Sequence, residues 1–390
     1  MCDPKSIYIH IPFCVKKCGY CDFFSNTDLS LIPDYILALQ NEIKKRADSE
    51  DKIDTIYFGG GTPSLLSVKD VDTLLHTITD TFKVCRDVEI TFEVNPGTIN
   101  LNYLRQLKKI GINRLSIGAQ SFNEDKLRFL TRIHSAEQSI KIINEAQKAG
   151  FDNISLDFIY GLYFETQTIW RKDLEQAIGM APSHLSCYML TIEPGTALNK
   201  KIQKGLFNPL GNKAMSTLFK NTIIFLDNNN YEQYEISNFS KVRQNRSRQN
   251  RSRHNRSRHN SKYWDMTPYY GFGAAAHSYD GETRSWNPKS IGKYIKDLDS
   301  GRLPVEEDET LTKNQLMMEM IMLRLRTLEG LDIAKFQTLF HDSFENRYKD
   351  ILEPILGESL GIINDQRFAL TLEGKIRLDS IVEAFAEKTL

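Results

Sequence analysis

The first half of the chain alternates between short runs of apolar, often β-branched residues and longer stretches whose apolar residues recur every three or four positions. A short apolar run predicts a buried strand, and the wider spacing predicts an amphipathic helix. The strands are expected at residues 6–11, 53–58, 88–94, 114–117, 153–159 and 185–190. The helices are expected at residues 34–47, 68–82, 101–110 and 136–149. Such βα repeats predict a parallel sheet wrapped by helices, either open or curled into a barrel.

The second half of the chain has a different, mostly helical pattern. A helix is expected at residues 212–227, before a strand-like segment at 232–236. Further helices are expected at residues 312–327, 332–341, 343–356 and 372–388, with a β-hairpin at 362–370 that turns at Asn364-Asp365. Helices with a hairpin are typical of winged-helix domains, of which some bind DNA and others only pack against a neighbour. Because this region is not basic, we expect no nucleic-acid binding.

Composition places the chain among globular proteins. It has 390 residues, of which 41% are hydrophobic and 26% are charged, close to the average for soluble domains. No apolar run reaches the ~18 residues that a membrane span needs. Met1-Cys2-Asp3 leads directly into a strand-like segment rather than an apolar leader. These features predict a cytoplasmic protein with no transmembrane segment.

One segment departs from the even charge balance. The net charge of the chain is zero, yet residues 241–262 hold nine basic and no acidic residues. This segment is a tandem repeat of Gln244–Arg248, continued by Gln249–Arg253 and His254–Arg258. A duplication inside a surface loop explains it, since lengthening a loop costs little free energy. The alternative is a basic arm for an anionic ligand.

Three cysteines follow the first predicted strand with the spacing Cys14-x3-Cys18-x2-Cys21. In a long chain without a leader, this spacing favours a metal site over disulfides. Iron–sulfur cubanes usually take four thiolates, so three would leave one iron open to a cofactor or substrate. A structural zinc site or unreactive thiols are the alternatives, although zinc sites more often use paired cysteines or histidines.

Further polar motifs come directly after predicted strands. Gly59–Pro63 follows the second strand and lacks the Lys-Ser/Thr of a nucleotide-binding P-loop. Glu93 ends the third strand, where a carboxylate can hold an ammonium group. Gly118–Phe122 follows the fourth strand, and Asp157 lies in the fifth. Since the carboxyl ends of parallel strands carry the chemistry in such folds, we expect a site there.

Together these motifs resemble those of the radical S-adenosylmethionine (SAM) superfamily. The resemblance also rests on Tyr8–Cys14, Tyr20–Phe23, Asp157–Leu162 and Gly271–Ser278, and it extends over residues 6–280. Within the superfamily, the sequence is most similar to the group of oxygen-independent coproporphyrinogen III oxidase and the HemW-type haem chaperones.

The resemblance implies an α/β fold with a partial (β/α)6 radical-SAM barrel followed by a mostly helical, winged-helix-like C-terminal domain. The expected division is residues 1–240 for the barrel with the cysteine loop, 241–262 for the repeat insert, 263–304 for the rest of the core, and 305–390 for the C-terminal domain.

The resemblance also implies two cofactors in the barrel. Cys14, Cys18 and Cys21 would bind three irons of a [4Fe-4S] cluster, and SAM would chelate the fourth. The residues implied to contact this SAM are Tyr8, Gly60, Gly61, Thr62 and Glu93. The oxidase holds a second SAM nearby, and the residues at those positions are Tyr20, Gln120, Arg132 and Asp157.

Two features separate this chain from the oxidase. Phe23 stands where the oxidase has a fourth cysteine, and only 13 residues precede Cys14, where the oxidase has a longer segment that helps to hold its substrate. We therefore expect no coproporphyrinogen oxidase activity and assign no catalytic residue.

The segment from His259-Asn260 to Tyr263-Trp264 resembles the HNxxYW motif that marks the HemW-type chaperones. The resemblance implies that His259 is an axial ligand of haem iron, with Tyr263 and Trp264 covering the porphyrin. Ordinary packing of a histidine beside two aromatic residues is the alternative.

These features predict a haem chaperone on a radical-SAM scaffold that delivers haem to respiratory acceptor proteins at the membrane. The alternatives are a coproporphyrinogen III oxidase of porphyrin biosynthesis and a radical-SAM enzyme acting on an unrelated substrate.

Overall fold

The computed structural model describes residues 4–242 and 253–390. It divides the chain into two compact units, and each is described by itself. The first unit comprises Met1–Gly211, Pro268–Asp280 and Arg284–Glu309. The second comprises Asn212–Thr267, Gly281–Thr283 and Thr310–Leu390.

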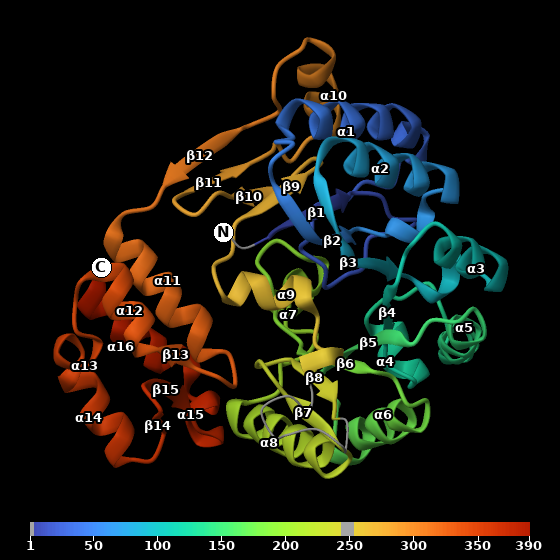
Figure 1. Ribbon diagram of the computed structural model, residues 1–390. Coiled ribbons are helices and arrows are strands. Elements are labelled where there is room, and N and C mark those ends of the chain that lie inside the picture. Colours follow the sequence, from blue (N-terminus) through green and yellow to red (C-terminus); the bar gives the residue numbers. More distant parts are fainter. Residues whose placement is uncertain (1–3, 243–252) are drawn as a thin grey trace. The chain divides into compact units, whose positions relative to one another are not determined.

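The first unit is built on a sheet whose first six strands are parallel and follow chain order (Figure 1). These strands are β1 (Lys5–Ile11), β2 (Lys52–Gly60), β3 (Lys83–Val94), β4 (Arg114–Gln120), β5 (Asn153–Tyr160) and β6 (His184–Met189). On the other side of β1 the sheet continues through β9 (Tyr269–Phe272), β10 (His277–Tyr279), β11 (Thr283–Trp286) and β12 (Glu307–Thr310). All six strands predicted before residue 190 are confirmed.

Helices connect the parallel strands along the outside of the sheet (Figure 1). They are α1 (Ile32–Arg46), α2 (Val68–Thr81), α3 (Leu101–Lys109), α4 (Glu124–Phe129), α5 (Ala136–Lys148) and α6 (Gln167–Gly179), with α7 (Ala197–Gln203) and α10 (Ile291–Asp299) following. Short 3-10 turns occur at Leu29–Leu31, Pro63–Leu65 and Pro96–Thr98. Ser67 and Ser135 begin α2 and α5 with reciprocal capping hydrogen bonds, which confirms the predicted starts.

The strand register gathers polar side chains on one face of the sheet. Neighbouring strands pair Thr91 with Arg114, and Glu93 with Ser116. Asp157 continues this face on β5, since residues two apart in a strand share a face. The alternate residues, such as Phe92 and Leu115, are fully buried. The apolar face therefore packs on helices, and the polar face is available for a site.

The second unit is mostly helical. Its first part contains α8 (Asn212–Asn228), β7 (Tyr231–Gln233), β8 (Asn238–Lys241), a 3-10 turn at Arg253–Asn255 and α9 (Arg258–Trp264). Its second part contains α11 (Lys313–Leu325), β13 (Leu331–Asp332), α12 (Ile333–Phe340), α13 (Phe344–Arg347), α14 (Lys349–Gly357), β14 (Gly361–Asn364), β15 (Arg367–Leu370), α15 (Leu372–Ile376) and α16 (Leu378–Thr389). Residues 244–252 of the predicted repeat lie outside the described residues.

The predicted C-terminal hairpin is confirmed, but two predicted helices are each broken in two. The hairpin turns at Asp365 and Gln366, both with positive φ (48° and 58°), and β13 adds a third strand. The helix predicted at 343–356 breaks at Tyr348, whose buried hydroxyl bonds to Thr389 Oγ1 at 2.7 Å. The helix predicted at 372–388 breaks at Arg377, with φ −104° and ψ 17°. Tertiary contacts thus override a continuous helical pattern.

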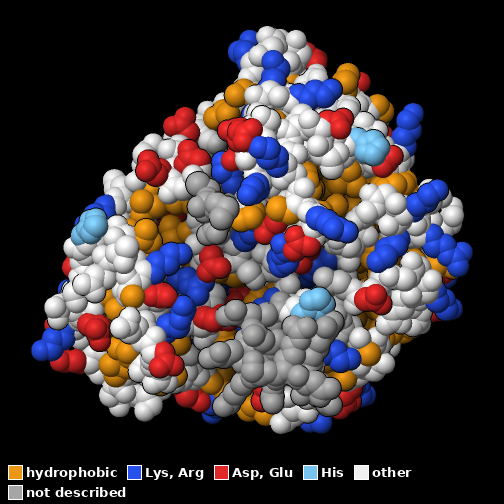
Figure 2. Space-filling view, in the orientation of Figure 1, with side chains coloured by type: hydrophobic (Ala, Val, Ile, Leu, Met, Phe, Trp, Pro, Cys, Tyr) orange, Lys and Arg blue, Asp and Glu red, His pale blue; other side chains and the backbone are white. Residues whose placement is uncertain are grey.

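Surface and length features bear on the expected partners. No helix among the described residues is long and apolar enough to cross a membrane. On the face drawn in Figure 2, Lys and Arg side chains are interspersed with Asp and Glu.

Candidate functional site

The three cysteines lie in the loop between β1 and α1. Phe13 and Asn26 bridge the base of this loop, and the Cys14 N–H donates to the Asn26 carbonyl at 2.9 Å. Cys14, Cys18 and Cys21 are free, partly exposed thiols. Burial raises the pKa of Cys21, and the Cys18 and Cys14 sulfurs add to this rise.

This donor set suits a cluster that binds each thiolate at a different iron. Among the described residues, no three His, Cys, Asp or Glu side chains converge on the position of a single metal ion. A cubane needs no such convergence, because its corners are separate iron atoms. The three cysteines offer sulfur ligands, which iron–sulfur clusters prefer.

The cysteine loop is held against the barrel by contacts on both sides of Gly19. The Gly19 N–H donates to Thr131 Oγ1 at 2.8 Å, and its carbonyl accepts the Leu198 N–H at 2.8 Å. Arg132 Nη1 lies 3.4 Å from Cys18 Sγ and 3.4 Å from the Tyr20 hydroxyl. Its buried Nε has no partner within the described structure, so it is a candidate donor for a carboxylate.

The glycines after β2 allow the chain to pass close to β1. The Gly61 N–H donates to the Ile11 carbonyl at 2.9 Å. At Gly60, φ is +108° and a Cβ would lie 2.6 Å from the ring of His10. Any larger residue would clash there, so glycine is required. Next to them, Thr62 Oγ1 lies 3.5 Å from Cys14 Sγ, which brings the glycine segment beside the cysteine loop.

Glu93 lies at the end of β3, beside the same glycines. Tyr57 donates a hydrogen bond to its Oε1 at 2.8 Å, and a Cβ on Gly59 would lie 3.1 Å from that oxygen. Burial raises the pKa of Glu93 to about 7, although the Tyr57 hydrogen bond opposes this rise. Such a carboxyl group is poised to ionise when an ammonium group arrives. Tyr8 stacks on Tyr57 and shares a 3.0 Å hydrogen bond with His10 Nδ1.

Asp157 stands on the polar face of β5 among hydroxyl groups. Ser116 and Ser155 donate to its carboxylate at 2.7 and 3.1 Å. Burial raises its pKa, and these hydrogen bonds oppose the rise. Gln120 ends β4 with φ 63°, a left-handed conformation that non-glycine residues rarely adopt. Gln120 and Asp157 thus lie on strands β4 and β5, while Tyr20 and Arg132 lie in the loops after β1 and α4.

Two neighbours of this site, Tyr57 and Arg114, carried no sequence signal of their own, while a third, His10, lay within the Tyr8–Cys14 motif. Tyr57 and His10 partner predicted site residues, and Arg114 is 1% exposed on β4, between the strands that carry Glu93 and Asp157. The Arg114 guanidinium lowers the pKa of both carboxyl groups against the effect of burial. Only the strand register, which pairs Thr91 with Arg114, reveals that this charge faces inward.

The HNxxYW residues form helix α9 in the second unit. Ser257 begins the helix by accepting the Asn260 N–H. His259 is 1% exposed, and its Nε2 lies 3.0 Å from the Tyr263 hydroxyl one turn later. Trp264 lies beneath Arg326, with the guanidinium 5.2 Å from the ring centre. The Trp264 Nε1 is buried without a hydrogen-bond partner in the described part of the chain.

The third pentad of the repeat is packed rather than solvated, which corrects the surface-loop interpretation for that part. The Arg256 side chain is 13% exposed, forms ion pairs with Glu329 and Glu232, and lies over the ring of Tyr234. Asn255 donates to the Lys241 carbonyl at 2.8 Å. The third pentad therefore packs through Arg256, which faces two carboxylates, and through Asn255, which faces a carbonyl group.

Comparison with known families decides where this chain belongs. Residues 8–177 match the radical SAM superfamily, and residues 311–376 match the HemN C-terminal domain. The heme chaperone HemW of Bacillus subtilis is 31% identical over 98% of this chain and 99% of its own. The chain belongs to the HemW group of the radical SAM superfamily. Membership implies a [4Fe-4S] cluster and SAM in the barrel.

Other relatives agree over the full length of this HemW-group protein. The heme chaperone HemW of Mycobacterium tuberculosis is 31% identical and covers 97% of this chain, which covers 94% of it. That of Escherichia coli is 32% identical, with 98% of each chain covered. Among solved structures, the radical SAM enzyme coproporphyrinogen III oxidase (HemN) of E. coli superposes with a TM-score of 0.83 at 25% identity, over 98% of this chain and 90% of its own. The predicted α/β fold is confirmed.

Proposed function

We propose that this protein is a haem chaperone that binds a SAM-ligated [4Fe-4S] cluster and haem, and delivers haem to respiratory acceptor proteins at the membrane from the cytoplasm. The observation that carries the proposal is the pairing of His259 with Tyr263 on α9. In the absence of haem, the phenol 3.0 Å from Nε2 orients the imidazole, and histidine is a common axial ligand of haem iron.

In the first unit, each residue has a distinct task. Cys14, Cys18 and Cys21 hold the cluster, which, when bound, supplies the electron for reductive cleavage of SAM. Glu93 holds the ammonium group of SAM, and Gly59 leaves room beside its Oε1. Asp157 accepts hydrogen bonds from ribose hydroxyl groups, while the Ser116 and Ser155 hydroxyls keep its carboxylate in place.

In the second unit, haem binding requires a local rearrangement of α9. The Nε2 of His259 faces the Tyr263 hydroxyl, and the imidazole is buried. If iron were held at Nε2, the Tyr263 hydrogen bond would be given up, and a hydrogen bond at the other ring nitrogen would orient the imidazole. The unpartnered Trp264 Nε1 offers a donor for a carboxylate such as a haem propionate.

Coproporphyrinogen oxidation is the second candidate function, because the fold superposes on that of HemN. Phe23 disfavours it. The Phe23 side chain is 67% exposed and offers no thiol where the oxidase motif has its fourth cysteine.

Anaerobic reconstitution followed by two parallel assays distinguishes these functions. The expected results are a haem complex with a Soret band that shifts in His259→Ala, and no protoporphyrinogen from coproporphyrinogen, SAM and a reductant. Clear turnover would establish the oxidase instead. A wild-type protein that binds no haem would disprove the chaperone proposal.

A further inference from the structure

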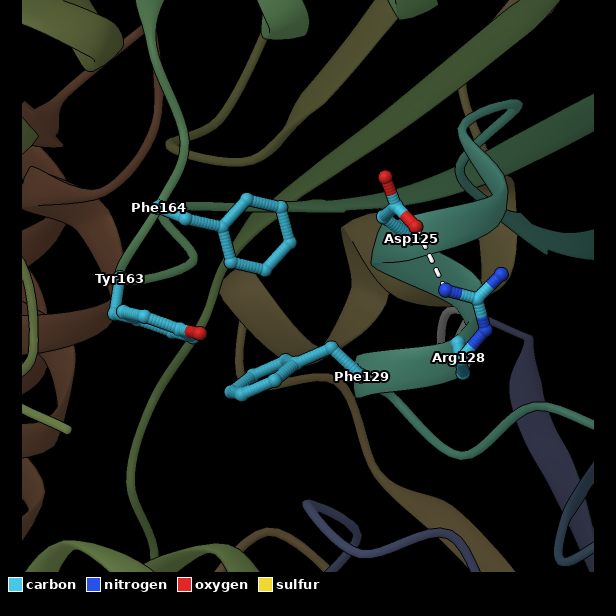
Figure 3. Close-up of a pocket in the computed structure, with 5 residues that line it drawn as sticks. All are labelled: Asp125, Arg128, Phe129, Tyr163 and Phe164. Atoms are coloured by element: carbon cyan, nitrogen blue, oxygen red, sulfur yellow. Dashed lines mark hydrogen bonds and ion pairs between the residues drawn. The ribbon is translucent and has the colours of Figure 1, made fainter. Parts of the chain in front are cut away.

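The first unit carries an aromatic hollow apart from the residues assigned to SAM. It has a volume of about 400 Å³ and is lined by Asp125, Arg128, Phe129, Tyr163 and Phe164. Figure 3 shows three aromatic rings on one side and the Asp125–Arg128 ion pair on the other. The side chain of Tyr163 is at the surface, and the residue is 43% exposed. Exposed rings gathered in a hollow are typical of binding sites.

Four rings from three separate segments form this surface, here called the ring cluster: Phe129, Tyr163, Phe164 and Phe207. The Phe129 ring centre lies 5.3, 5.8 and 5.2 Å from those of Tyr163, Phe164 and Phe207. Tyr163 and Phe207 stack at 4.8 Å with 24° between their planes. These centre-to-centre distances are those that aromatic pairs prefer. A further flat ring can therefore stack on the ring cluster at a similar distance.

A buried ionic network holds this surface in place. The Lys126 ammonium is fully buried on α4, where it pairs with Glu165 and lies 2.8 Å from Asp173. Glu165 accepts the backbone N–H groups of Gly161 and Leu162 at 2.6 and 3.2 Å, directly before Tyr163. The loop that carries two of the rings is therefore fixed from beneath, and a ligand pays little ordering entropy there.

The hollow shares its apolar floor with the cysteine loop. Leu130, Ile159 and Leu162 form a small buried cluster. Phe129 and Phe164 pack on it from the hollow, and Tyr20 packs on it from the cysteine loop. A ligand in the hollow therefore lies next to the cluster site within the same unit.

We propose that the ring cluster binds the face of a porphyrin macrocycle, with Arg128 receiving a propionate carboxylate. This inference rests on the proposed haem function and adds a second contact surface, distinct from His259. Porphyrins are flat and aromatic with carboxylates at one edge, which matches rings on one side and a guanidinium on the other. The Asp125–Arg128 pair is about three-quarters exposed, and such exposed pairs contribute little to stability, so a propionate can replace Asp125.

The five lining residues include no imidazole, thiol or thioether, and the ring of the one phenol, Tyr163, is stacked on Phe207, so the hollow recognises the ring rather than the iron. Iron-free protoporphyrin IX is therefore the probe, since His259 cannot ligate it. Fluorescence titration of the full-length, cluster-loaded protein should give about tenfold weaker binding in Tyr163→Ala and in Phe129→Leu. The Leu variant keeps the apolar volume beneath the ring, and its cluster content and thermal melting should match the wild type.

The role of Arg128 at the edge of the hollow is tested against a matched exposed arginine, Arg171. Arg128→Ala should weaken protoporphyrin binding about threefold, as expected for one exposed charge. Arg171→Ala removes a guanidinium from a similar exposed ion pair on α6, with Glu175 at 2.8 Å, and should have no effect. His259→Ala should alter the haem spectrum, because it removes the proposed iron ligand.

Failure of this inference is distinguishable from failure of the proposed function. If ring-cluster variants bind protoporphyrin like the wild type, or His259→Ala alone abolishes that binding, the hollow is not a porphyrin site, even though haem ligation by His259 stands. Binding of an apolar peptide with no protoporphyrin binding would also overturn it. A wild-type protein that binds neither haem nor protoporphyrin would overturn both.

Discussion

At the residue scale, the sequence motifs identify the chemical groups of the site, whereas only the structure identifies their hydrogen-bonding and charged partners. Glu93 was predicted from its place at a strand end, yet its proton affinity is set by burial and by Tyr57 on the neighbouring strand. The inward charge of Arg114 could not be predicted, because an arginine at the start of a strand is ordinarily solvated. Local sequence motifs identify the residues that bind a ligand, whereas the pKa values of those residues depend on which side chains the strand register places beside them.

Glu93 predicts a pH dependence of SAM binding. Because its pKa is about 7, SAM affinity should fall about tenfold per pH unit below that value if the ionised form binds the ammonium group. Equilibrium dialysis of SAM with reconstituted protein measures this slope. Glu93→Gln should bind SAM more weakly. Its SAM affinity should no longer vary with pH through this carboxyl group, although any pH dependence from titration of SAM itself remains. An unchanged slope in the Gln variant would contradict this role.

The raised pKa of Glu93 also predicts how the stability of the SAM-free protein changes with pH. The folded pKa of Glu93 lies above the ordinary value of 4.5, so the native state holds the proton longer than the unfolded state. The contribution of this group to the free energy of unfolding is therefore greatest below pH 4.5 and is lost as the pH rises through about 7. Urea titrations of wild type and Glu93→Gln over this range measure the difference.

The cysteine loop predicts a sharp division among the thiols. Reconstituted protein should hold about four irons and four sulfides, and Cys14→Ala, Cys18→Ala or Cys21→Ala should each abolish the cluster, as measured by iron content and by dithionite-sensitive absorption. Cys85→Ala, on β3, is the control that should retain it. Retention of a full cluster in all three loop variants would rule out the assigned ligands.

At the scale of elements, periodicity predicted the parallel strands well and the second unit less well. Each strand before residue 190 combines an apolar run with a capped helix, so local and tertiary preferences agree. Helix α9 was not predicted, because its seven residues carry no clear apolar stripe, and the Arg258–Trp264 segment owes its helix to the Ser257 cap and to contacts distant in sequence. Its anchors, Glu329 and Arg326, follow more than 60 residues later.

Arg256 is the strongest test of how α9 is held. Burial alone would raise the pKa of Glu329, but the Arg256 guanidinium outweighs it and keeps that pKa below its usual value. Arg256→Ala should lower the free energy of unfolding by about 1–3 kcal/mol, measured by urea denaturation. Deletion of residues 244–253, which are almost entirely outside the described residues, should leave stability and cluster assembly intact. Equal losses in both variants would mean that the whole repeat is structural.

At the scale of the whole molecule, the second unit is assembled from segments far apart in sequence. Lys375, from the C-terminal segment, donates to Gln233 Oε1 at 2.9 Å, and burial lowers the pKa of Lys375 to about 8. Such pairings join residues 212–267 to residues 310–390 within one unit. The local sequence pattern does not predict such pairings, because neither partner lies in a distinctive sequence motif.

The separation of chemistry between units leads to a prediction about the two cofactors. The cluster ligands belong to the first unit, while His259, its partner Tyr263 and the anchoring Arg256–Glu329 pair belong to the second. A Cys14→Ala/Cys18→Ala/Cys21→Ala variant should therefore lose the cluster but bind haem within about threefold of the wild-type affinity, a difference below ~1 kcal/mol. Conversely, His259→Ala should retain its iron and sulfide.

Spectroscopic titration of both variants with haem separates the two outcomes. A wild-type Soret band in the cysteine variant, and a shifted one in His259→Ala, would place axial ligation in the second unit alone. If removal of the cluster weakened haem binding by more than about tenfold, the first unit would contribute to haem binding, through the cluster or through the hollow beside it, because no residue of the α9 anchor changes in that variant. The assignment of His259 as an independent ligand would then be wrong.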